Sequence, residues 1–332
     1  MARKNWRLVA VAAMLAVVAT ACGSNTPSAN GLEGEVTLWH AYGSSGGSAE
    51  GTAFAEQLAK FEKEFPKIKI NAVEVPFSDI FTKFKTEAAA GGGPDLFIAP
   101  NDELGNLVTA GLLEPITEKE VPNLKHVWKK SLEVIPNAGI VHTYQYTALI
   151  WNKKQIEKPT SWNDYWSPNA KYGDKIKGHV MAFEPGNLLS IYALIMAAKL
   201  KGGDVNKMDG AWDLLKAQKP WVGATVMASA AAAPYFENEQ IWIAPYWSAR
   251  AAYYEAQKYP IGLTVPKEGT IGLANCAGIP IGAKNKKLAF EFLNWRLDKD
   301  IQRDFHMAYF SSPGRPDITD WPQAFKDVQI TT

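Results

Sequence analysis

Apolar and polar positions along the chain follow the periods of strands and helices in turn. Residues 35–41 (EVTLWHA) alternate apolar and polar side chains, which is typical of a half-buried strand. Residues 52–65 place apolar side chains at helical spacing, and Pro66 marks the end of that helix. Residues 95–99 (DLFIA) are almost wholly apolar, which is typical of a parallel strand buried on both faces.

The same alternation predicts secondary structure as far as residue 309. We expect further strands at residues 68–75, 146–152, 177–183, 240–244, 261–265 and 273–280. We expect further helices at residues 77–90, 102–110, 187–201, 210–219, 247–258, 285–297 and 299–309. Strand–helix repetition at this spacing indicates an α/β protein of two lobes, each with a doubly wound sheet. Ligands of such folds bind beyond the carboxyl ends of the strands, here in a cleft between the lobes.

Composition narrows the class of protein. The 332 residues allow about two domains. The chain has 35 Lys+Arg and 34 Asp+Glu, and this balance argues against a nucleic-acid partner, which would require a basic excess. A charged fraction of 21% with 11% aromatic residues indicates a folded protein rather than a disordered one.

The N-terminus has the pattern of an export signal. Three basic residues precede residues 8–21, a stretch of 14 uncharged residues that is too short for a comfortable membrane span. We therefore expect a signal peptide at residues 1–21. Small residues before Cys22 resemble a lipobox, so Cys22 is expected to carry a lipid and residues 22–34 to form a flexible tether. The alternative is an ordinary signal peptide with a chance cysteine.

Motifs for catalysis, metal ions or nucleotides are not found in the sequence. The five histidines lack paired metal-ligand spacing, and there is no GxSxG motif. The GGGPD turn lacks the Lys-Ser/Thr of a phosphate-binding loop. Cys276 has no local signature of a catalytic thiol and is expected to be a buried apolar residue. We therefore expect no catalytic residue, no metal site and no cofactor.

Several segments together carry a family resemblance. They are VTLWHAYG at 36–43, FEKEFPKIKI at 61–70, GGGPDLFIAPNDELG at 91–105, AGLLEPI at 110–116, TALIWNKKQI at 147–156, ENEQIWIAPYWSA at 237–249, VPKEG at 265–269 and IPIGAKNKKLAFEFLNWRL at 279–297. In this order they resemble the extracytoplasmic solute-binding proteins of ABC importers. The first third is most similar to the maltose-binding group, and the last third is as similar to the spermidine/putrescine-binding branch. The segment before residue 147 is shorter than usual in that family, which alters one expected wall of the cleft.

The resemblance implies a fold and a function. The fold is the two-lobe periplasmic-binding-protein fold of type II, with a hinge of crossing strands. We place lobe 1 at residues 33–140 plus 268–315, lobe 2 at residues 141–267 and a C-terminal tail at residues 316–332. The implied function is capture of a small solute, first of all a carbohydrate, in the cell envelope, and delivery to an ABC permease and its ATPase by lobe closure. The protein would act as a monomer, held to the outer face of the membrane by its lipid or free in the periplasm.

Candidate ligand contacts lie at the ends of the predicted strands. A sugar presents an apolar face ringed by hydroxyls, so an aromatic plane with nearby carboxylates or amides holds it well. Asp102 and Glu184 match ligand contacts of the maltose group, and Tyr246 with Trp247 matches an aromatic contact of both groups. Gly186 stands where the maltose group has a stacking tyrosine. The expected ligand-binding residues are Trp39, His40, Tyr42, Asn101, Asp102, Tyr144, Glu184, Tyr246, Trp247 and Asn275.

Four alternatives are open, one for the role of two residues and three for the ligand or activity. For Asn101 and Asp102, capping of the following helix is the competing role. Asn275 stands where the polyamine branch carries an aspartate, and an amide does not neutralise a cation, which disfavours a polyamine without excluding it. The glycine- and serine-rich loop at residues 43–48 precedes a helix, which favours an anion and makes a phosphate-bearing solute the second choice. A glycoside hydrolase would present similar tryptophans and carboxylates.

Overall fold

The computed structural model describes residues 31–42, 49–76 and 79–321. The predicted signal peptide, the lipidation site Cys22, the loop at residues 43–48 and most of the predicted tail lie outside the described residues. Within the described part of the chain, no helix has both the length and the apolar character that crossing a membrane would require.

Three parallel strands and one antiparallel strand form the sheet of the first lobe. The strands are β1 (Gly34–His40), β2 (Ile68–Glu74), β3 (Leu96–Pro100) and β9 (Gly272–Gly278). β1 lies parallel to β2 and β3, and β9 runs antiparallel to β3. The helices that cover this sheet are α1 (Ala49–Glu64), α2 (Ile80–Ala89), α3 (Asn101–Thr109), α11 (Lys286–Arg296) and α12 (Lys299–Tyr309).

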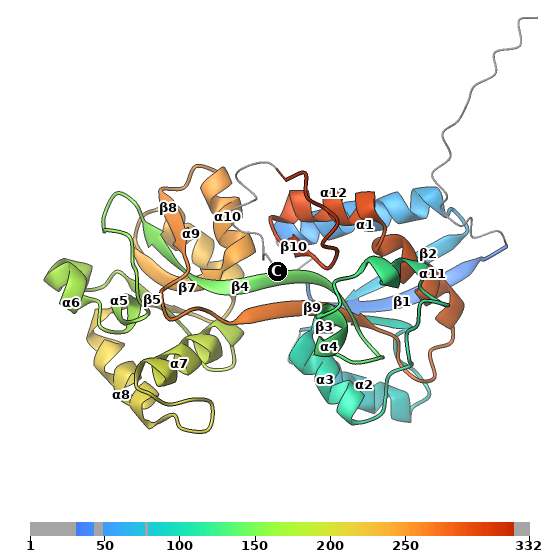
Figure 1. Ribbon diagram of the computed structural model, residues 1–332, viewed down its shortest axis with the longest axis horizontal. Helices are drawn as coiled ribbons and strands as arrows, with labels where there is room; N and C mark the ends of the chain where they lie inside the picture. Colours follow the sequence, from blue (N-terminus) through green and yellow to red (C-terminus); the bar gives the residue numbers. More distant parts are fainter. Residues whose placement is uncertain (1–30, 43–48, 77–78, 322–332) are drawn as a thin grey trace, which may run out of the picture. The chain divides into compact units, whose positions relative to one another are not determined.

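Alternate residues of β1 enter different cores, because successive side chains of a strand point to opposite faces. Val36 and Leu38 pack with residues of α1, α11 and α12, whereas Trp39 packs with residues of α2 and α3. Figure 1 shows α1 and α12 on one side of this sheet and α2 and α3 on the other. β3 lies between the two helix layers and is buried throughout, which explains its continuous apolar sequence.

The second lobe repeats this plan. Its strands are β5 (Val180–Phe183), β6 (Val222–Val226) and β7 (Ile243–Trp247), which are parallel, with β8 (Ile261–Thr264) at one side. Its helices are α5 (Asn163–Trp166), α6 (Asn169–Tyr172), α7 (Leu188–Leu200), α8 (Asp209–Gln218), α9 (Ala233–Glu237) and α10 (Ser248–Ala256). The short elements of both lobes are α4 (Ser131–Val134), β10 (Ser312–Pro313), η2 (Pro122–His126), η3 (Gly173–Ile176), η4 (Lys219–Trp221) and η5 (Ser229–Ala232).

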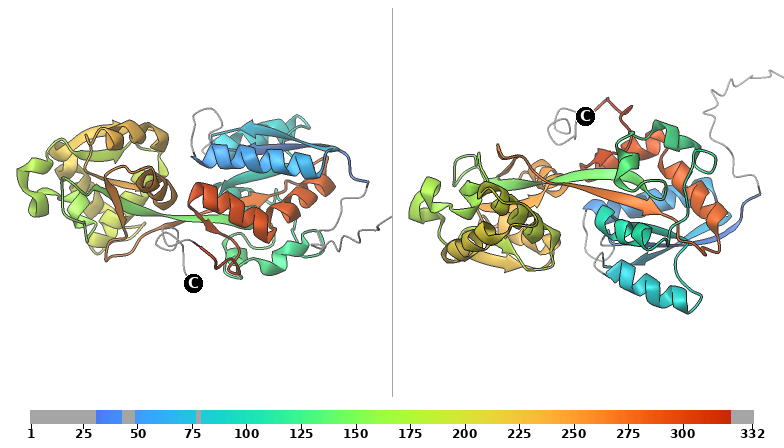
Figure 2. Two further views of the ribbon diagram at one scale, coloured as in Figure 1. Left: turned by 90° about the horizontal axis from the view of Figure 1, so that it is seen from above. Right: turned by 60° about the horizontal axis from the view of Figure 1, so that its bottom comes forward.

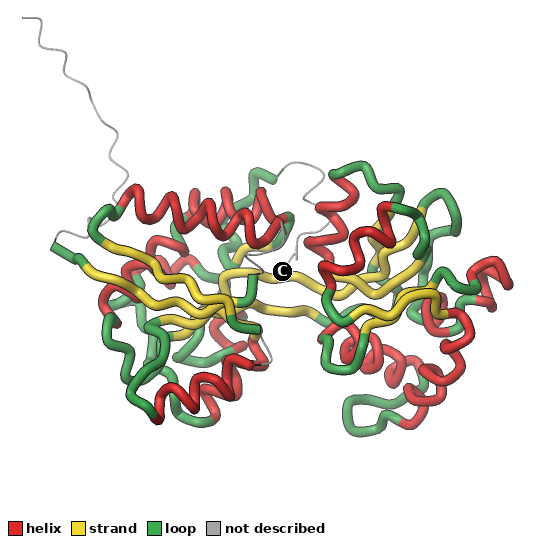
Figure 3. Tube along the Cα trace, turned by 180° about the vertical axis from the view of Figure 1, so that it is seen from behind, coloured by secondary structure: helices red, strands yellow, loops and turns green. Residues whose placement is uncertain are grey.

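One long strand, β4 (Ile140–Asn152), belongs to both sheets. Its first half, Ile140–Tyr146, pairs with β9, and its second half pairs with β7 and β8, so the strand order is β2-β1-β3-β9-β4-β7-β5-β6. Figures 2 and 3 show β4 and β9 side by side as the strands that run between the two lobes. In each lobe, therefore, three parallel strands are completed by an antiparallel strand that also reaches the other lobe.

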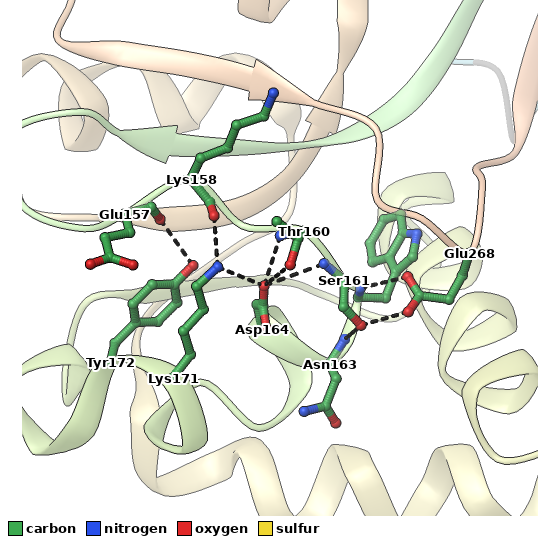
Figure 4. A network of polar contacts seen from close by, with 10 residues as sticks. Glu157, Lys158, Thr160, Ser161, Asn163, Asp164, Lys171, Tyr172 and Glu268 are labelled. Carbon is green, nitrogen blue, oxygen red and sulfur yellow. Dashed lines mark hydrogen bonds and ion pairs between the residues drawn. The ribbon is translucent and has the colours of Figure 1, made fainter.

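The β8–β9 connection is fastened to the second lobe by a polar network (Figure 4). The Glu268 carboxylate accepts hydrogen bonds from the Ser161 hydroxyl at 2.6 Å and from the Trp162 backbone N–H at 3.1 Å. The Trp162 indole donates to the Gly269 carbonyl, and Asp164 organises the same turn by accepting from the backbone N–H of Thr160. The network fixes one end of this connection, so bending between the lobes is expected closer to β9.

Most predicted elements are present, with ends that differ by a few residues. The strand predicted at 240–244 is wrong in position: β7 lies at Ile243–Trp247 and includes Pro245. Because proline has no N–H to donate, a strand is expected to end before Pro245. The structure instead includes Pro245 in β7, opposite Leu149 of β4. The prediction also missed β6, whose burial pattern alternates over only five residues, and the first half of β4.

Candidate functional site

A cavity of about 570 Å³ lies where strand ends of both lobes meet. The first lobe contributes Ala41, Glu50, Glu74, Pro76, Pro100, Asp102, Glu103 and Tyr309. The second lobe contributes Gly186, Asn187, Leu188, Ile191, Met227, Ala228, Ser229, Ala230, Trp247 and Arg250. The crossing strands β4 and β9 contribute Gln145, Leu273 and Asn275. The carboxyl ends of the parallel strands open on this cavity, which is the position where α/β folds bind ligands.

The two walls of the cavity differ in chemistry. The first-lobe wall carries the carboxylates, which belong to Glu50, Glu74, Asp102 and Glu103. Among the described lining residues, Arg250 is the only Arg or Lys. The second-lobe wall is mainly aliphatic, and its Ile191 and Met227 side chains are 40% and 57% exposed. This arrangement suits a solute that has hydrogen-bond donors on one side and an apolar surface on the other.

An ion pair crosses the cavity from one lobe to the other. A guanidinium nitrogen of Arg250 on α10 lies 3.7 Å from a carboxylate oxygen of Glu50 on α1, and both side chains are largely buried. The Tyr309 hydroxyl on α12 lies near the Glu50 carboxyl and donates a hydrogen bond to the side-chain oxygen of Gln145 at 3.4 Å. Burial raises the pKa of Glu50 to about 7, although Arg250 and the nearby Tyr309 hydroxyl oppose this shift. Burial acts to lower the pKa of Arg250, but the attraction of Glu50 and nearby tyrosines more than offsets it and raises the pKa overall.

Two lining residues carry buried acceptor oxygens that have no hydrogen-bond partner among the residues that the structure describes. One is Oε2 of Glu103 and the other is Oδ1 of Asn275. Burial, together with the nearby charge of Asp102, raises the pKa of Glu103. A buried acceptor without a donor is unfavourable by roughly 1–3 kcal/mol. Donors that a solute brings to this wall would remove that penalty.

Three of the sequence-predicted residues line the cavity: Asp102, Trp247 and Asn275. Asp102 is exposed at the start of α3, and Trp247 is the last residue of β7. The Trp247 ring is 8% exposed and meets Tyr192 edge to face, with centroids 5.9 Å apart. These residues come from both lobes and from a crossing strand, as expected for ligand contacts in a cleft.

Trp39, His40 and Tyr42 lie outside the cavity lining, in the core of the first lobe. Tyr42 is 1% exposed, and its hydroxyl accepts a hydrogen bond from the buried Arg296 at 3.1 Å. His40 accepts from the Tyr42 backbone N–H through Nδ1, and burial lowers the pKa of His40 to about 4. The end of β1 is therefore a packed aromatic and polar cluster.

Asn101, Tyr144, Glu184 and Tyr246 also lie outside the lining. Asn101 is the first residue of α3, and its side-chain oxygen accepts from the Ala274 backbone N–H; the N-cap is Pro100, so the predicted capping role is wrong. The Tyr144 hydroxyl on β4 donates to the Ser131 hydroxyl on α4. Glu184 follows β5 and holds the turn before α7 through its backbone carbonyl.

Tyr246 shapes the cavity without lining it. Its ring is fully buried, and its hydroxyl donates to the backbone carbonyl of Ser229, a lining residue, at 2.6 Å. The same hydroxyl lies beside Arg250. Tyr246 therefore fixes the position of the second-lobe wall.

Sequence reasoning missed Glu50, Arg250, Gln145 and Tyr309. Arg250 carried a usable signal, because it follows Trp247 by three residues at the start of a predicted helix and so shares its face. No sequence signal indicated Glu50 or Tyr309. They lie on α1 and α12, near opposite ends of the chain, and only the fold brings them together. Within the described residues, no group of three or more His, Cys, Asp or Glu side chains could hold a metal ion.

Comparisons with known proteins agree with this architecture. A family model described as bacterial extracellular solute-binding protein matches residues 56–332. A galactooligosaccharide-binding protein of Bacillus subtilis is 25% identical over 220 residues, which cover 62% of this chain and 51% of that protein. This chain thus spans about half the length of that relative. A spermidine/putrescine-binding periplasmic protein of Escherichia coli is 23% identical over 255 residues, 74% of this chain and 70% of that protein.

Solved structures show the same fold. The crystal structure of an ABC transporter substrate-binding protein from Bradyrhizobium japonicum matches with a TM-score of 0.71 at 18% identity, over 89% of this chain and 88% of that one. The predicted two-lobe periplasmic-binding-protein fold is confirmed. Since the family model matches well over half of its residues, the chain belongs to the bacterial extracellular solute-binding proteins.

Proposed function

We propose that this protein captures a small solute in the cavity between its lobes and delivers it to an ABC permease and its ATPase. The position of the cavity supports this proposal, because a solute that touches both walls has higher affinity for a closed arrangement and shifts the population toward it. Binding with micromolar affinity supplies a free energy of about 8 kcal/mol. This exceeds the cost of closing the lobes, which is on the order of a few kcal/mol. We place the lobes at about residues 33–140 plus 268–315 and residues 141–267, with the boundaries inside β4 and the β8–β9 connection, because the first half of β4 pairs with β9 and Glu268 bonds the second lobe.

A carbohydrate is the first proposed solute. The observation that carries it is the pair of buried, unpartnered acceptors on Glu103 and Asn275, because sugar hydroxyls are donors that match them. Trp247 supplies an aromatic surface at the same cavity. A relative named for galactooligosaccharide binding supports the same class.

A polyamine is the second candidate. Four carboxylates against one guanidinium in the described lining favour a cation, and ammonium groups are also donors. A relative named for spermidine and putrescine binding supports this class. The amide of Asn275 fits it less well than a carboxylate would. The same charge balance disfavours the phosphate-bearing solute.

Isothermal titration calorimetry of residues 32–332 with maltotriose, galactotriose, putrescine and spermidine separates these classes. We expect micromolar binding of a sugar and none of the amines. Binding of the amines alone would replace the first candidate by the second, and binding of neither would contradict the proposal. Hydrolysis of a chromogenic glycoside would contradict a purely binding role.

Anchoring through Cys22 is part of the proposal. An export signal followed by a cysteine and a polar tether supports it. The Cys22→Ala variant should then appear in the soluble fraction, whereas the wild type stays with the membranes. Equal partition of both proteins would contradict lipidation.

A further inference from the structure

The Glu50–Arg250 pair has a role that the capture mechanism does not require. It lies in the cavity wall, and its two members come from different lobes. The side chains of Glu50 and Arg250 are 8% and 20% exposed, so solvent screens their attraction little. Arg250 is also the only Arg or Lys of the described lining. An anionic group on a solute would therefore need this one guanidinium, which Glu50 already faces.

We propose that Arg250 forms an anion-accepting subsite of the cavity, and that Glu50 occupies it as a built-in carboxylate that excludes anionic solutes. This inference rests on the proposal that the cavity is the solute site. The Glu50 carboxylate lies 3.7 Å from the Arg250 guanidinium, the position that a carboxylate, sulfate or phosphoryl group of a solute would take. The specificity of the cavity for uncharged or cationic solutes would then depend on one side chain.

The surroundings of Glu50 define how the subsite responds to pH. The charged and titratable groups that face Glu50 or Arg250 are Tyr42 after β1, Arg296 on α11, Tyr309 on α12, and Tyr246 and Tyr254 of the second lobe. Burial raises the pKa of Tyr42, Tyr246 and Tyr309, and the arginines stay charged near neutral pH, so Glu50 is the carboxyl of this set that titrates there. Because burial raises its pKa to about 7, acidification should release Arg250.

Sulfate is a suitable probe, because it stays divalent across this range and needs no knowledge of the natural solute. Calorimetric titration at about pH 8 compares the wild type with Glu50→Gln, with the double variant Glu50→Gln/Arg250→Gln, and with Asp102→Asn. The last removes one charge from the same cavity without freeing Arg250, so it is the matched control. We expect Glu50→Gln to bind sulfate at least tenfold more tightly than the wild type, and the double variant and Asp102→Asn to stay within about threefold of it.

Equal sulfate affinity of Glu50→Gln and Asp102→Asn would overturn the inference, as would sulfate binding that survives loss of Arg250. The wild type gives a second measurement if Glu50→Gln does not fold. Its sulfate affinity should rise between about pH 8 and about pH 6, and Arg250→Gln should lose this rise. No rise in the wild type would also overturn it. Failure of every sugar and amine to bind would contradict the proposed function but would leave the sulfate comparison valid.

Discussion

Several side chains shape the cavity from behind its surface. Tyr246 holds the carbonyl of Ser229, and Asn101 accepts a hydrogen bond from the backbone of β9 beside Asn275. Neither lines the cavity, so their substitution would alter binding through the position of the wall. Direct contact with solute is expected instead from side chains in the lining, of which Trp247 is the largest.

Replacement of Trp247 by alanine tests the lining at the residue scale. Loss of an aromatic contact surface typically removes about 1.5–3 kcal/mol, so the affinity for the best solute should fall by about 10- to 100-fold. Trp212→Ala is the matched control, because Trp212 is 46% exposed on α8 and absent from the lining. Calorimetry should show unchanged affinity for the control. An equal affinity of Trp247→Ala and wild type would remove Trp247 from the site.

Individual site residues could be predicted only in part. Asp102, Trp247 and Asn275 could be predicted from the sequence, because polar or aromatic residues at strand ends tend to face the ligand. Tyr42 and Tyr246 have the same sequence context, yet both are buried; local sequence does not reveal that Arg296 and Ser229 will bind their hydroxyls. The Glu50–Arg250 pair forms only where the two lobes approach each other, so no local sequence pattern could predict it.

At the scale of elements, glycine positions show where the backbone packs tightly. A Cβ on Gly223 in β6 would lie 1.7 Å from the carbonyl oxygen of Gly178, so backbone would have to move. A Cβ on Gly105 inside α3 would meet nothing within 4 Å. The same substitution therefore has opposite effects in the two elements.

Gly223→Ala should lower the free energy of unfolding by about 1–3 kcal/mol, as overpacking does. Gly105→Ala should raise it by up to about 1 kcal/mol, because alanine has higher helix propensity. Urea denaturation of both variants measures the two changes. A stable Gly223→Ala protein with an unchanged midpoint would show that β6 does not pack against residue 178 as described.

Elements with a strong local period were predictable, and those fixed by tertiary pairing were not. α1 and α12 were expected within three residues of their observed ends, since their apolar positions recur at helical spacing. The first half of β4 contains HTYQY with three buried polar residues, His142, Thr143 and Gln145, which suppressed the strand signal. His142 is buried because its imidazole is hydrogen-bonded to Tyr42 and Thr143.

At the scale of the whole molecule, buried neutral histidines link stability to pH. Burial lowers the pKa of His306 to about 3 and of His40 to about 4, and it lowers that of His142 well below its usual value. The unfolded chain takes up protons near pH 6.5, whereas these folded histidines do not. Their contribution to stability is therefore lost as pH falls from about 6.5 toward 4. Glu50, Glu103 and Glu291 act in the opposite direction, because burial raises the pKa of each carboxyl, and they offset part of this loss.

The free energy of unfolding should accordingly fall by roughly 1.4 kcal/mol per histidine for each pH unit below about 6.5. Urea titrations at about pH 7 and about pH 5 measure this change. His306→Gln should reduce the proton uptake on unfolding at about pH 5 by about one. Stability that is flat or rises on acidification would contradict the burial of these histidines.

The proposed capture mechanism requires two lobes that close on one solute between them. Small-angle X-ray scattering of residues 32–332, with and without a saturating amount of the solute found by calorimetry, tests this most directly. We expect the radius of gyration to decrease on binding for the wild type, and to stay constant for Trp247→Ala at the same solute concentration. An unchanged radius of gyration for the wild type at full saturation would contradict capture by closure.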